Sequence, residues 1–270
     1  MAGSSELDAG VASIVDAFVR ARREGRALPD YPGDVPEDLV TAYRCQELAI
    51  GRWPDHIGGW KVARIPPHAR DQYPEERLIG PAFKRNIHFA VSNTPVECPV
   101  FPGGFAAVEA ELVVRVGKTS PSEARKWTIE EAVEYVGSIH VGVEVASSPL
   151  ATLNQLGPGA VISDFGNNWG VIVGPEVKEW RSLSQIAAQT FIDDESVGQG
   201  VASIRDGALG AVAFVLTKCA ERGRRLYEGD VISTGMITGV HDVRVGQVSR
   251  LIFERHGEVQ CRITAEQANP

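Results

Sequence analysis

The sequence predicts an α+β fold, in which an N-terminal helical region (residues 1–58) precedes a strand-rich mixed β-sheet core (residues 59–270). Three observations support this division. Apolar residues near the N-terminus recur at the three- and four-residue spacing of an amphipathic helix. Beyond residue 58, short runs rich in β-branched residues are separated by Gly and Pro. Few long helical patterns lie between these runs, which favours a mixed sheet over a repeated βαβ unit.

Composition and charge exclude several classes of protein. The chain has 270 residues, of which 43% are hydrophobic and 23% charged, as is typical of a globular protein with a substantial core. Its net charge is -8 and it has no basic tract, so we expect neither nucleic acid nor an anionic membrane as partner. No stretch approaches the roughly 20 apolar residues of a membrane span or resembles a signal peptide. We therefore expect a cytoplasmic protein.

The four cysteines do not form a recognisable ligand or disulfide pattern. Cys45, Cys98, Cys219 and Cys261 lie far apart in the chain, and no two of them form a CxxC pair. This spacing supports neither a zinc site nor a disulfide scaffold. We interpret the four residues as buried free thiols.

Two helices are predicted in the N-terminal region. The first covers residues 6–23 and ends at Gly25, with apolar residues on one face. The segment DYPGDVPEDL interrupts the pattern with two prolines and a glycine. The second helix begins after Pro36 and runs through LVTAYRCQELAIGRW. Together they form a helical region of about 55 residues.

The remaining chain is predicted to be mainly β-structure. Seven segments have the β-branched, Gly-bounded character of strands: residues 58–65, 107–116, 139–146, 170–174, 212–219, 229–235 and 248–256. Helical patterns intervene at TIEEAVEYVGS (128–138) and around SLSQIAAQ (182–189).

Two carboxylates interrupt an apolar strand, VEAELVVRVG. Because side chains alternate across a strand, Glu109 and Glu111 share one face with Val113 and Arg115, and the opposite face is core. Residues two apart lie roughly 6.5 to 7 Å apart at the backbone, a gap that glutamate side chains can close onto one ion. Two interpretations remain: a polar face that meets water, or half of a metal site.

A third glutamate in a second apolar strand favours the metal site. In IHVGVEVASS, Glu144 shares its face with small residues. A buried, unpaired carboxylate is costly, so it must be exposed, paired with a cation or bound to metal. Oxygen ligands alone favour a hard ion, Mg²⁺ or Mn²⁺, which keeps coordination positions for water and substrate.

Lys61 and Asp164 are further candidates, each with two interpretations. Lys61, in GGWKVAR, either extends its ammonium group to solvent or binds the carboxylate of an acidic substrate and takes part in proton transfer. Asp164, in VISDFGNNWG, either caps the turn that follows or belongs to an active site.

The order of five segments resembles the fumarylacetoacetate hydrolase superfamily. These are GWK (59–61), VEAELVVRVG (108–117), HVGVEVASS (140–148), ISDFGNNWGVIVG (162–174) and GDVISTG (229–235). The length and the N-terminal helices resemble the 2-keto-4-pentenoate hydratase and 4-oxalocrotonate decarboxylase branch. The resemblance implies a β-sheet roll of the fumarylacetoacetate hydrolase C-terminal type, which would carry the active site within residues 59–270.

The resemblance also implies roles for individual residues. The metal ligands for Mg²⁺ or Mn²⁺ would be Glu109, Glu111 and Glu144. The catalytic residues would be Lys61 and Asp164, with Asp164 positioning water. The substrate-binding residues would be Lys61, Asn167, Thr234 and Gly235.

The implied function is that of a Mg²⁺-dependent lyase. It would be a hydratase of a small 2-oxo or 2-hydroxy-dienoic acid, similar to 2-keto-4-pentenoate hydratase, acting through a metal-stabilised enolate. Alternatives are decarboxylation of a vinylogous 2-keto acid, hydrolysis of an acylpyruvate C–C bond, and a non-catalytic partner subunit. The partner is then a small-molecule 2-oxo acid, and the resemblance implies a homo-oligomer.

The sequence departs from the family pattern at three places that bear on the reaction. Residues 62–83, which we expect to form the substrate-facing loop, contain several prolines and charges. Phe165, Gly166 and Asn167 follow Asp164 where relatives carry a hydroxyl-bearing residue. The superfamily's hydrolases use a Glu/His pair on a lid helix, whereas Glu47 and His56 are nine residues apart, too far for one short helix to present both. The last departure favours a lyase over a hydrolase.

Overall fold

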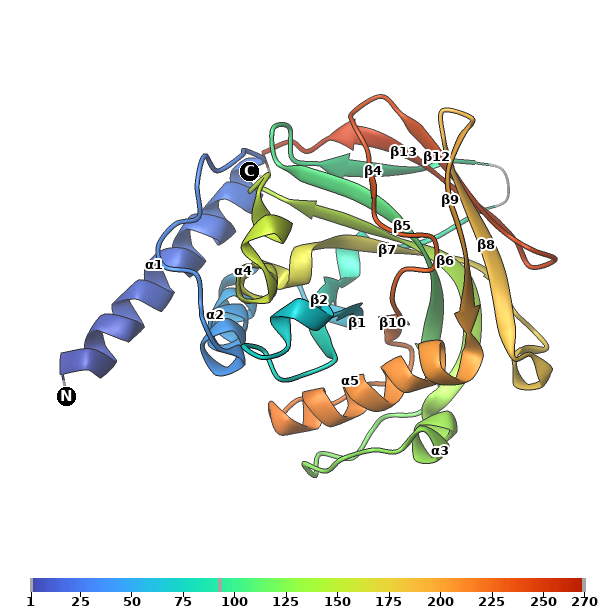
Figure 1. Cartoon of the computed structure of the whole chain (residues 1–270), viewed down its shortest axis with the longest axis horizontal. Coiled ribbons are helices and arrows are strands. Elements are labelled where there is room, and N and C mark those ends of the chain that lie inside the picture. The colour runs from blue at the N-terminus through green and yellow to red at the C-terminus, as the bar shows by residue number, and fades with distance from the viewer. Residues whose placement is uncertain (1, 92–93, 269–270) are drawn as a thin grey trace.

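The fold consists of two curled β-sheets with helices against them, as the sequence predicts. The computed structural model describes residues 2–91 and 94–268. In Figure 1 the strands curve around the upper right of the molecule, α1 lies at the left and α5 lies at the bottom. The fold class, α+β with N-terminal helices and a strand-rich core, is confirmed.

The described residues form five α-helices: α1 (Ala2–Glu24), α2 (Leu39–Arg52), α3 (Ile129–Ala132), α4 (Pro158–Ser163) and α5 (Gly210–Glu221). A π-helical segment, η7 (Ile204–Leu209), leads directly into α5. α2 begins at Leu39, after Pro36 as predicted, and its Asp38 cap accepts a hydrogen bond from the Thr41 amide.

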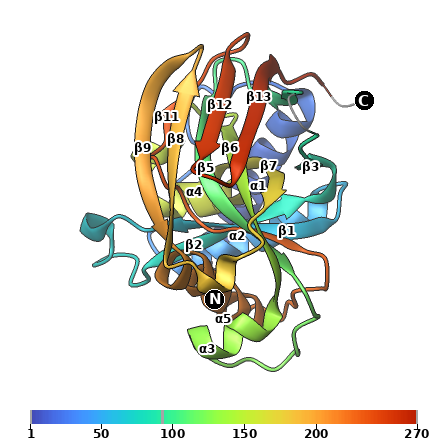
Figure 2. The same ribbon diagram turned by 90° about the vertical axis from the view of Figure 1, so that its right-hand side faces the viewer.

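Thirteen strands are described. They are β1 (Ile57–Arg64), β2 (Arg77–Phe83), β3 (Ile87–Phe89), β4 (Val96–Val100), β5 (Phe105–Val116), β6 (Val136–Ser148), β7 (Asn168–Glu176), β8 (Gln185–Ile192), β9 (Glu195–Ser203), β10 (Val231–Ser233), β11 (His241–Asp242), β12 (Val248–Phe253) and β13 (Gly257–Ala265). The larger sheet has the order β2-β1-β10-β5-β6-β7-β3, with β11 also paired to β5. The smaller has the order β4-β13-β12-β8-β9, and β13, β12, β8 and β9 face the viewer in Figure 2.

Two local predictions are wrong, each because burial outweighs local propensity. Residues 212–219, predicted as a strand from their apolar, β-branched run, lie in α5. That helix is buried over most of its surface, and an apolar run of this length does not distinguish a buried helix from a strand. Residues 182–189, predicted as helical, lead into β8, where Ile186, Ala188 and Thr190 alternate inward.

The predicted loop over residues 62–83 is shorter than expected. β1 extends to Arg64 and residues 77–83 form β2, so only residues 65–76 connect the two strands. Pro81, one of the prolines of this segment, lies within β2. β2 is an edge strand that pairs only with β1, a position where the missing amide of proline is tolerated.

The N-terminal helices pack on the same hydrophobic cluster as the sheets. Val15 and Phe18 of α1 are almost completely buried in a cluster that continues through the strands of both sheets. The C-terminal segment passes beside the end of α1, since a Cβ added at Gly25 would lie 2.9 Å from the Gln267 carbonyl carbon. The domain boundary at residue 58 stays a prediction. The four cysteines are free and buried, as expected, and no helix in the described ranges is long and apolar enough to cross a membrane.

Candidate metal centre and substrate cavity

The register of β5 and β6 brings the three predicted glutamates together. The strands are antiparallel, with Glu109 directly opposite Glu144 and Glu111 opposite Gly142. Directly opposed side chains on an antiparallel pair are close neighbours, and a glycine opposite Glu111 leaves room for a carboxylate. One carboxylate oxygen from each residue lies within 4.8 Å of the other two.

The glutamate face of β5 is not a wet outer surface. Glu111 and Glu144 are fully buried and Glu109 is 7% exposed. A second hydrophobic cluster, which includes Val113, Val171 and Val231, covers the same face. The alternative interpretation, that these carboxylates simply meet water, is therefore wrong.

Protein donors satisfy only part of this carboxylate cluster. Glu111 Oε2 accepts hydrogen bonds from Ser233 Oγ and, at 2.8 Å, from the Gly235 amide. Glu144 Oε1 accepts one from Asn168 Nδ2 at 3.1 Å. Within residues 2–91 and 94–268, Glu111 Oε1 and Glu144 Oε2 are buried and have no hydrogen-bond partner. Buried oxygens without a partner are costly, and three converging carboxylates fit a divalent cation, so the residues present can hold a metal.

The pKa values of these carboxyl groups in the absence of metal also indicate that the cluster favours a bound cation. Burial, reinforced by the charge of Glu144, raises the pKa of Glu109 to about 8. The same two causes raise the pKa of Glu111 well above its usual value. Three buried carboxylates cannot all ionise at neutral pH without a nearby positive charge.

Lys61 supplies one positive charge to the cluster. It lies on β1 with its side chain buried, and its Nζ is 3.1 Å from Glu144 Oε1. Burial alone would lower the pKa of this ammonium group, but the carboxylates of Glu144 and Glu109 raise it above its usual value. The interpretation that Lys61 merely extends to solvent is wrong.

A strained turn, residues 164–167, packs against Lys61. Phe165, Gly166 and Asn167 all have positive φ angles, of 54°, 70° and 62°. A Cβ at Gly80, which lies opposite Lys61 on β2, would be 2.2 Å from the Phe165 carbonyl oxygen. Only glycine at position 80 therefore allows the turn to approach this closely. Consecutive left-handed residues that are not all glycine cost energy and persist where the surroundings hold them.

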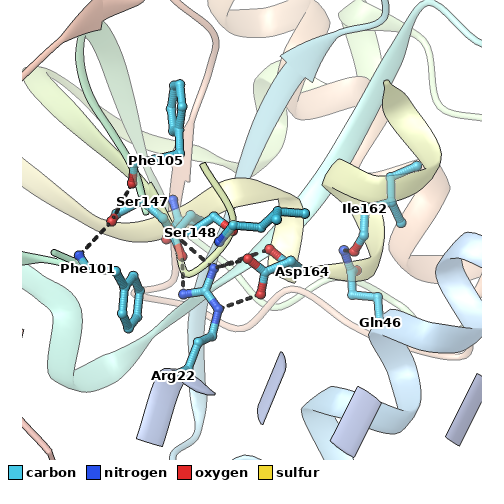
Figure 3. A network of polar contacts seen from close by, with 10 residues as sticks. Arg22, Gln46, Phe101, Phe105, Ser147, Ser148, Ile162 and Asp164 are labelled. Atoms are coloured by element: carbon cyan, nitrogen blue, oxygen red, sulfur yellow. Dashed lines mark hydrogen bonds and ion pairs between the residues drawn. The ribbon is translucent and has the colours of Figure 1, made fainter. Parts of the chain in front are cut away.

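Asp164 is held by an arginine that the sequence analysis missed. Arg22, in the last turn of α1, donates from Nε and Nη2 to the two carboxylate oxygens of Asp164 at 2.5 and 2.9 Å. Figure 3 shows the guanidinium group of Arg22 between Asp164 and the β6 residues Ser147 and Ser148. Nη2 also donates to the Ser147 carbonyl at 3.0 Å and Nη1 to the Asn168 carbonyl at 3.3 Å. Arg22 thus ties α1 to the strand that carries Glu144 and to the turn beside Lys61.

A cavity of about 550 Å³ opens beside the cluster. Of the predicted site residues, Lys61, Glu109, Asn167, Thr234 and Gly235 line it. Asp164 does not, and it is completely buried against Arg22. Asp164 therefore makes no contact with the cavity that would support its predicted role in positioning water.

The two residues considered as a hydrolytic pair lie away from the cavity. Glu47, on α2, forms ion pairs with Arg222 and Arg224. His56 follows α2 and is exposed. Neither lines the cavity.

Several site residues carried no recognised signal in the sequence. Arg22 lies four residues after Phe18 and seven after Val15, on the apolar face of α1, and that position would have indicated a buried arginine. Ser233 and Asn168 contact the glutamates only because β10 and β7 flank the central strand pair.

Comparison with known proteins agrees with this arrangement. The family model of the fumarylacetoacetate (FAA) hydrolase C-terminal matches residues 54–265. The chain belongs to the fumarylacetoacetate hydrolase C-terminal family. The match includes all the site residues described above except Arg22 and Glu47. Among curated protein sequences, none matches the chain.

Solved structures of this fold include several enzymes. 4-Oxalocrotonate decarboxylase from Pseudomonas putida G7, complexed with magnesium and adipate, is 21% identical with a TM-score of 0.78, over 94% of this chain and 97% of that chain. Fumarylpyruvate hydrolase from Pseudomonas aeruginosa, in complex with Mn²⁺ and pyruvate, is 20% identical with a TM-score of 0.56, over 77% and 89%. 2-Hydroxyhepta-2,4-diene-1,7-dioate isomerase from Mycobacterium marinum is 16% identical with a TM-score of 0.55, over 78% and 77%. At these identities the similarity establishes the fold.

Proposed function

We propose that the chain is a divalent-metal-dependent lyase acting on a small 2-oxo or 2-hydroxy-dienoic acid, a hydratase similar to 2-keto-4-pentenoate hydratase. The observation that carries the proposal is the buried cluster of Glu109, Glu111 and Glu144, adjacent to the cation of Lys61 at the wall of a cavity. A carboxylate triad beside a lysine suits a substrate that carries both a metal-binding oxygen pair and a carboxylate.

Mg²⁺ or Mn²⁺ is the proposed cofactor. Three carboxylates without nitrogen or sulfur ligands favour a hard cation. Solved structures of the same fold were obtained with magnesium, calcium or Mn²⁺. When bound, the ion would supply Lewis-acid stabilisation of the negative charge that develops on the oxygens of a 2-oxo acid.

The other proposed roles belong to the residues of the cavity wall. Lys61 Nζ would pair with the substrate carboxylate. Asn167 Oδ1 is buried and has no partner in the described chain, while its Nδ2 donates to Asn154 at 3.1 Å. This oxygen is available to accept a hydrogen bond from a bound water or a substrate hydroxyl. Thr234 and Gly235 would border the substrate, with their backbone position fixed by bonds to Leu112 and Glu111.

Two observations favour a lyase over a hydrolase. Glu47 forms ion pairs with two arginines and His56 is exposed, and neither lines the cavity, so these two residues do not form a water-activating pair there. The similarity to 4-oxalocrotonate decarboxylase extends over 94% of the chain, whereas that to fumarylpyruvate hydrolase extends over 77%.

The same extended similarity makes decarboxylation of a vinylogous 2-keto acid the second candidate. Hydration and decarboxylation share the development of negative charge next to the 2-oxo group, and they differ in what leaves or adds at the far carbon. The present site residues serve either reaction.

The experiment offers three substrates to purified protein with Mg²⁺. We expect loss of 2-hydroxypenta-2,4-dienoate absorbance for a hydratase, or CO₂ release from 2-oxohex-3-enedioate for a decarboxylase. Rapid pyruvate release from acetylpyruvate, with neither of the other reactions, would contradict the lyase. A protein that turns over none of them alone, but does so with a partner enzyme, would instead be the non-catalytic subunit. Homo-oligomerisation and a cytoplasmic location stay predictions.

A further inference from the structure

β9 is an edge strand without the usual protection. It is the last strand of the smaller sheet in the described ranges and lies, in orange, at the left border of the molecule in Figure 2. Within residues 2–91 and 94–268, no backbone–backbone hydrogen bond joins it to any segment other than β8. Its nine residues contain one charged side chain and no proline, although exposed edges are usually short or carry charges and prolines. β9 therefore offers free backbone donors and acceptors to another strand.

The centre of β9 reads the same in both directions. Residues 197–201 are VGQGV, with Gln199 in the middle. If two copies of this strand pair antiparallel across a two-fold axis at Gln199, Val197 of one copy lies opposite Val201 of the other. The two Gln199 side chains then face each other. The β8–β9 register is irregular only beside Val197, at the end of this stretch. A contact between identical surfaces must be complementary to itself, and this stretch is.

The free edge of β9 is held in place from behind. A Cβ at Gly200 would lie 2.0 Å from the Ile237 carbonyl oxygen, and one at Gly198 would lie 2.6 Å from the Thr238 carbonyl oxygen. The segment after β10 can pack this closely under β9 only because both positions are glycine. β9 is thus fixed by β8 on one side and by this segment beneath it, so that little ordering is needed when a second strand binds.

Exposed apolar side chains gather beside the same edge. Val197, Val201, Met236 and Val240, here called the edge patch, are four of the ten large hydrophobic residues exposed in the described part of the chain. Val201 and Met236 are 55% and 52% exposed. Three of the four also border the cavity, so they lie near one another although they come from different segments. An exposed apolar patch on a water-soluble surface marks a contact site.

The charges at the two ends of β9 favour an antiparallel arrangement. Residues 193–195, at its start, are three exposed acidic residues, and the exposed Arg205 lies two residues beyond its end. An antiparallel pair of copies places the acidic end of one beside Arg205 of the other, whereas a parallel pair places like charges together. Arg205 also forms an ion pair with Glu130 of its own chain, so these exposed charges set orientation more than affinity.

We propose that β9 pairs with β9 of a second copy of this chain across a two-fold axis at Gln199. The two smaller sheets then form one continuous sheet, and the edge patches of the two copies pack against each other. Because Val201, Ala202 and Ser203 line the cavity, β9 of the second copy borders the cavity mouth. The second copy thus completes the rim of the site, whichever reaction the site performs.

Sedimentation velocity over a range of protein concentrations tests this association. Wild-type protein should form a dimer or an even-numbered assembly of dimers. Gln199→Lys and Gln199→Glu each place like charges directly opposite, and each should weaken the association at least about tenfold. A mixture of the two variants should recover it, because lysine then faces glutamate. Gln155→Lys, which changes an exposed glutamine in η4 (Leu153–Leu156), is the matched control and should associate as wild type does.

Cysteine substitutions test the register of the pair. Under mild oxidation Gln199→Cys should form a disulfide between copies, since directly opposed Cβ atoms lie about 5 Å apart. Val197→Cys alone should not, because its two copies are four residues apart along the pair, about 13 Å. A mixture of Val197→Cys and Val201→Cys proteins should form the disulfide, since these positions face each other. The four native cysteines are buried and do not compete.

Three results would overturn the proposal. The first is a wild-type protein that stays monomeric at every concentration, which would leave the edge patch to another occupant, such as the apolar end of a substrate. The second is a Gln199→Lys variant that associates as wild type does. The third is a disulfide in Val197→Cys but none in Gln199→Cys. Gln199 is exposed, and circular dichroism of each variant verifies that it is folded. Turnover tests the proposed function separately from all of these measurements.

Discussion

Arg22 in α1 and Asp164 in the strained turn form a buried, two-pronged ion pair, with N···O distances of 2.5 and 2.9 Å. The pair connects the N-terminal helix with the turn that packs on Lys61. Asp164 was expected to position water at the active site, but its carboxylate binds Arg22 and does not line the cavity. Its place suggests that it positions the turn residues Phe165, Gly166 and Asn167.

Arg22→Ala is therefore expected to affect both stability and turnover. Loss of one partner of a buried pair leaves an uncompensated charge and costs about 3–5 kcal/mol of unfolding free energy. Because Asn167 and Lys61 would shift with the turn, kcat should fall more than KM rises. The measurements are a denaturant titration and steady-state kinetics on whichever of the three candidate substrates the wild-type protein turns over. Arg23→Ala removes an adjacent, exposed arginine and should change neither quantity.

A partial recovery in Arg22→Lys would support the positioning role. Lysine restores the charge but not the two-pronged geometry, so stability should return further than kcat does. If Arg22→Ala reduces stability but leaves kcat unchanged at a temperature where the protein is folded, the ion pair has a structural role only.

Gly80→Ala is expected to disturb the same turn from the opposite side. The added Cβ would lie 2.2 Å from the Phe165 carbonyl oxygen, so the turn or β2 must move. Overpacking of this kind costs about 1–3 kcal/mol. Gly51→Ala, in α2, is the matched control, since no atom lies within 4 Å of its added Cβ. We expect Gly51→Ala to be slightly more stable than wild type and Gly80→Ala to be less stable, and thermal unfolding of both variants measures the difference. Equal melting temperatures would show that the turn is not closely packed.

Without metal, the protein should become less stable as the pH rises from about 4.5 to about 8. Burial and Glu144 raise the pKa of Glu109 to about 8, whereas in the unfolded chain it is near 4.5. As the pH rises above 4.5, Glu109 loses its proton in the unfolded chain but keeps it in the folded protein. The stability that is fully present below pH 4.5 is therefore lost progressively until the pH reaches the folded pKa of about 8. Thermal unfolding in the presence of a chelator measures this trend. A melting temperature that rises with pH across this window would contradict it.

Glu111→Gln should stabilise the metal-free protein. The amide has the shape of the carboxyl group, and its oxygen can still accept from Ser233 and Gly235. Because burial and the neighbouring carboxylates raise the pKa of Glu111, folding at neutral pH must either protonate this group or bury its charge, and glutamine removes that cost. Thermal unfolding with chelator should show a higher melting temperature than wild type. Glu97→Gln, which changes an exposed glutamate on β4, should not. A lower melting temperature for Glu111→Gln would mean that its negative charge supports the fold without metal.

The sequence predicts the strands of the site well because their patterns are local. The period-two alternation around Glu109 and Glu111 and again around Glu144 identifies both strands and the face of each carboxylate. The helix that follows η7 was assigned as a strand, because residues buried on all sides lose the periodicity that distinguishes the two. Residues 77–83, which were expected to lie in a loop, form β2, because the edge position that tolerates Pro81 is a property of the sheet and not of the local sequence.

The contacts between segments that are far apart in the chain could not be predicted from local sequence patterns. The register of β5 against β6 determines that Glu144 faces Glu109, and no local signal fixes this register. Arg22 is 142 residues from Asp164 in the chain. The strand patterns and the family resemblance both indicated the glutamates, and the resemblance indicated the cavity residues Lys61, Asn167, Thr234 and Gly235. The structure added Arg22, Ser233 and Asn168.

Calorimetric titration of chelator-treated protein with Mg²⁺ and Mn²⁺ tests the central claim most directly. The account predicts one site per chain in wild type, an unchanged site in Glu97→Gln, and an affinity reduced at least about tenfold in Glu111→Gln, since one of three charged ligands is lost. If wild-type protein binds neither ion, or if Glu111→Gln binds them as tightly as wild type does, the three glutamates do not form a metal centre.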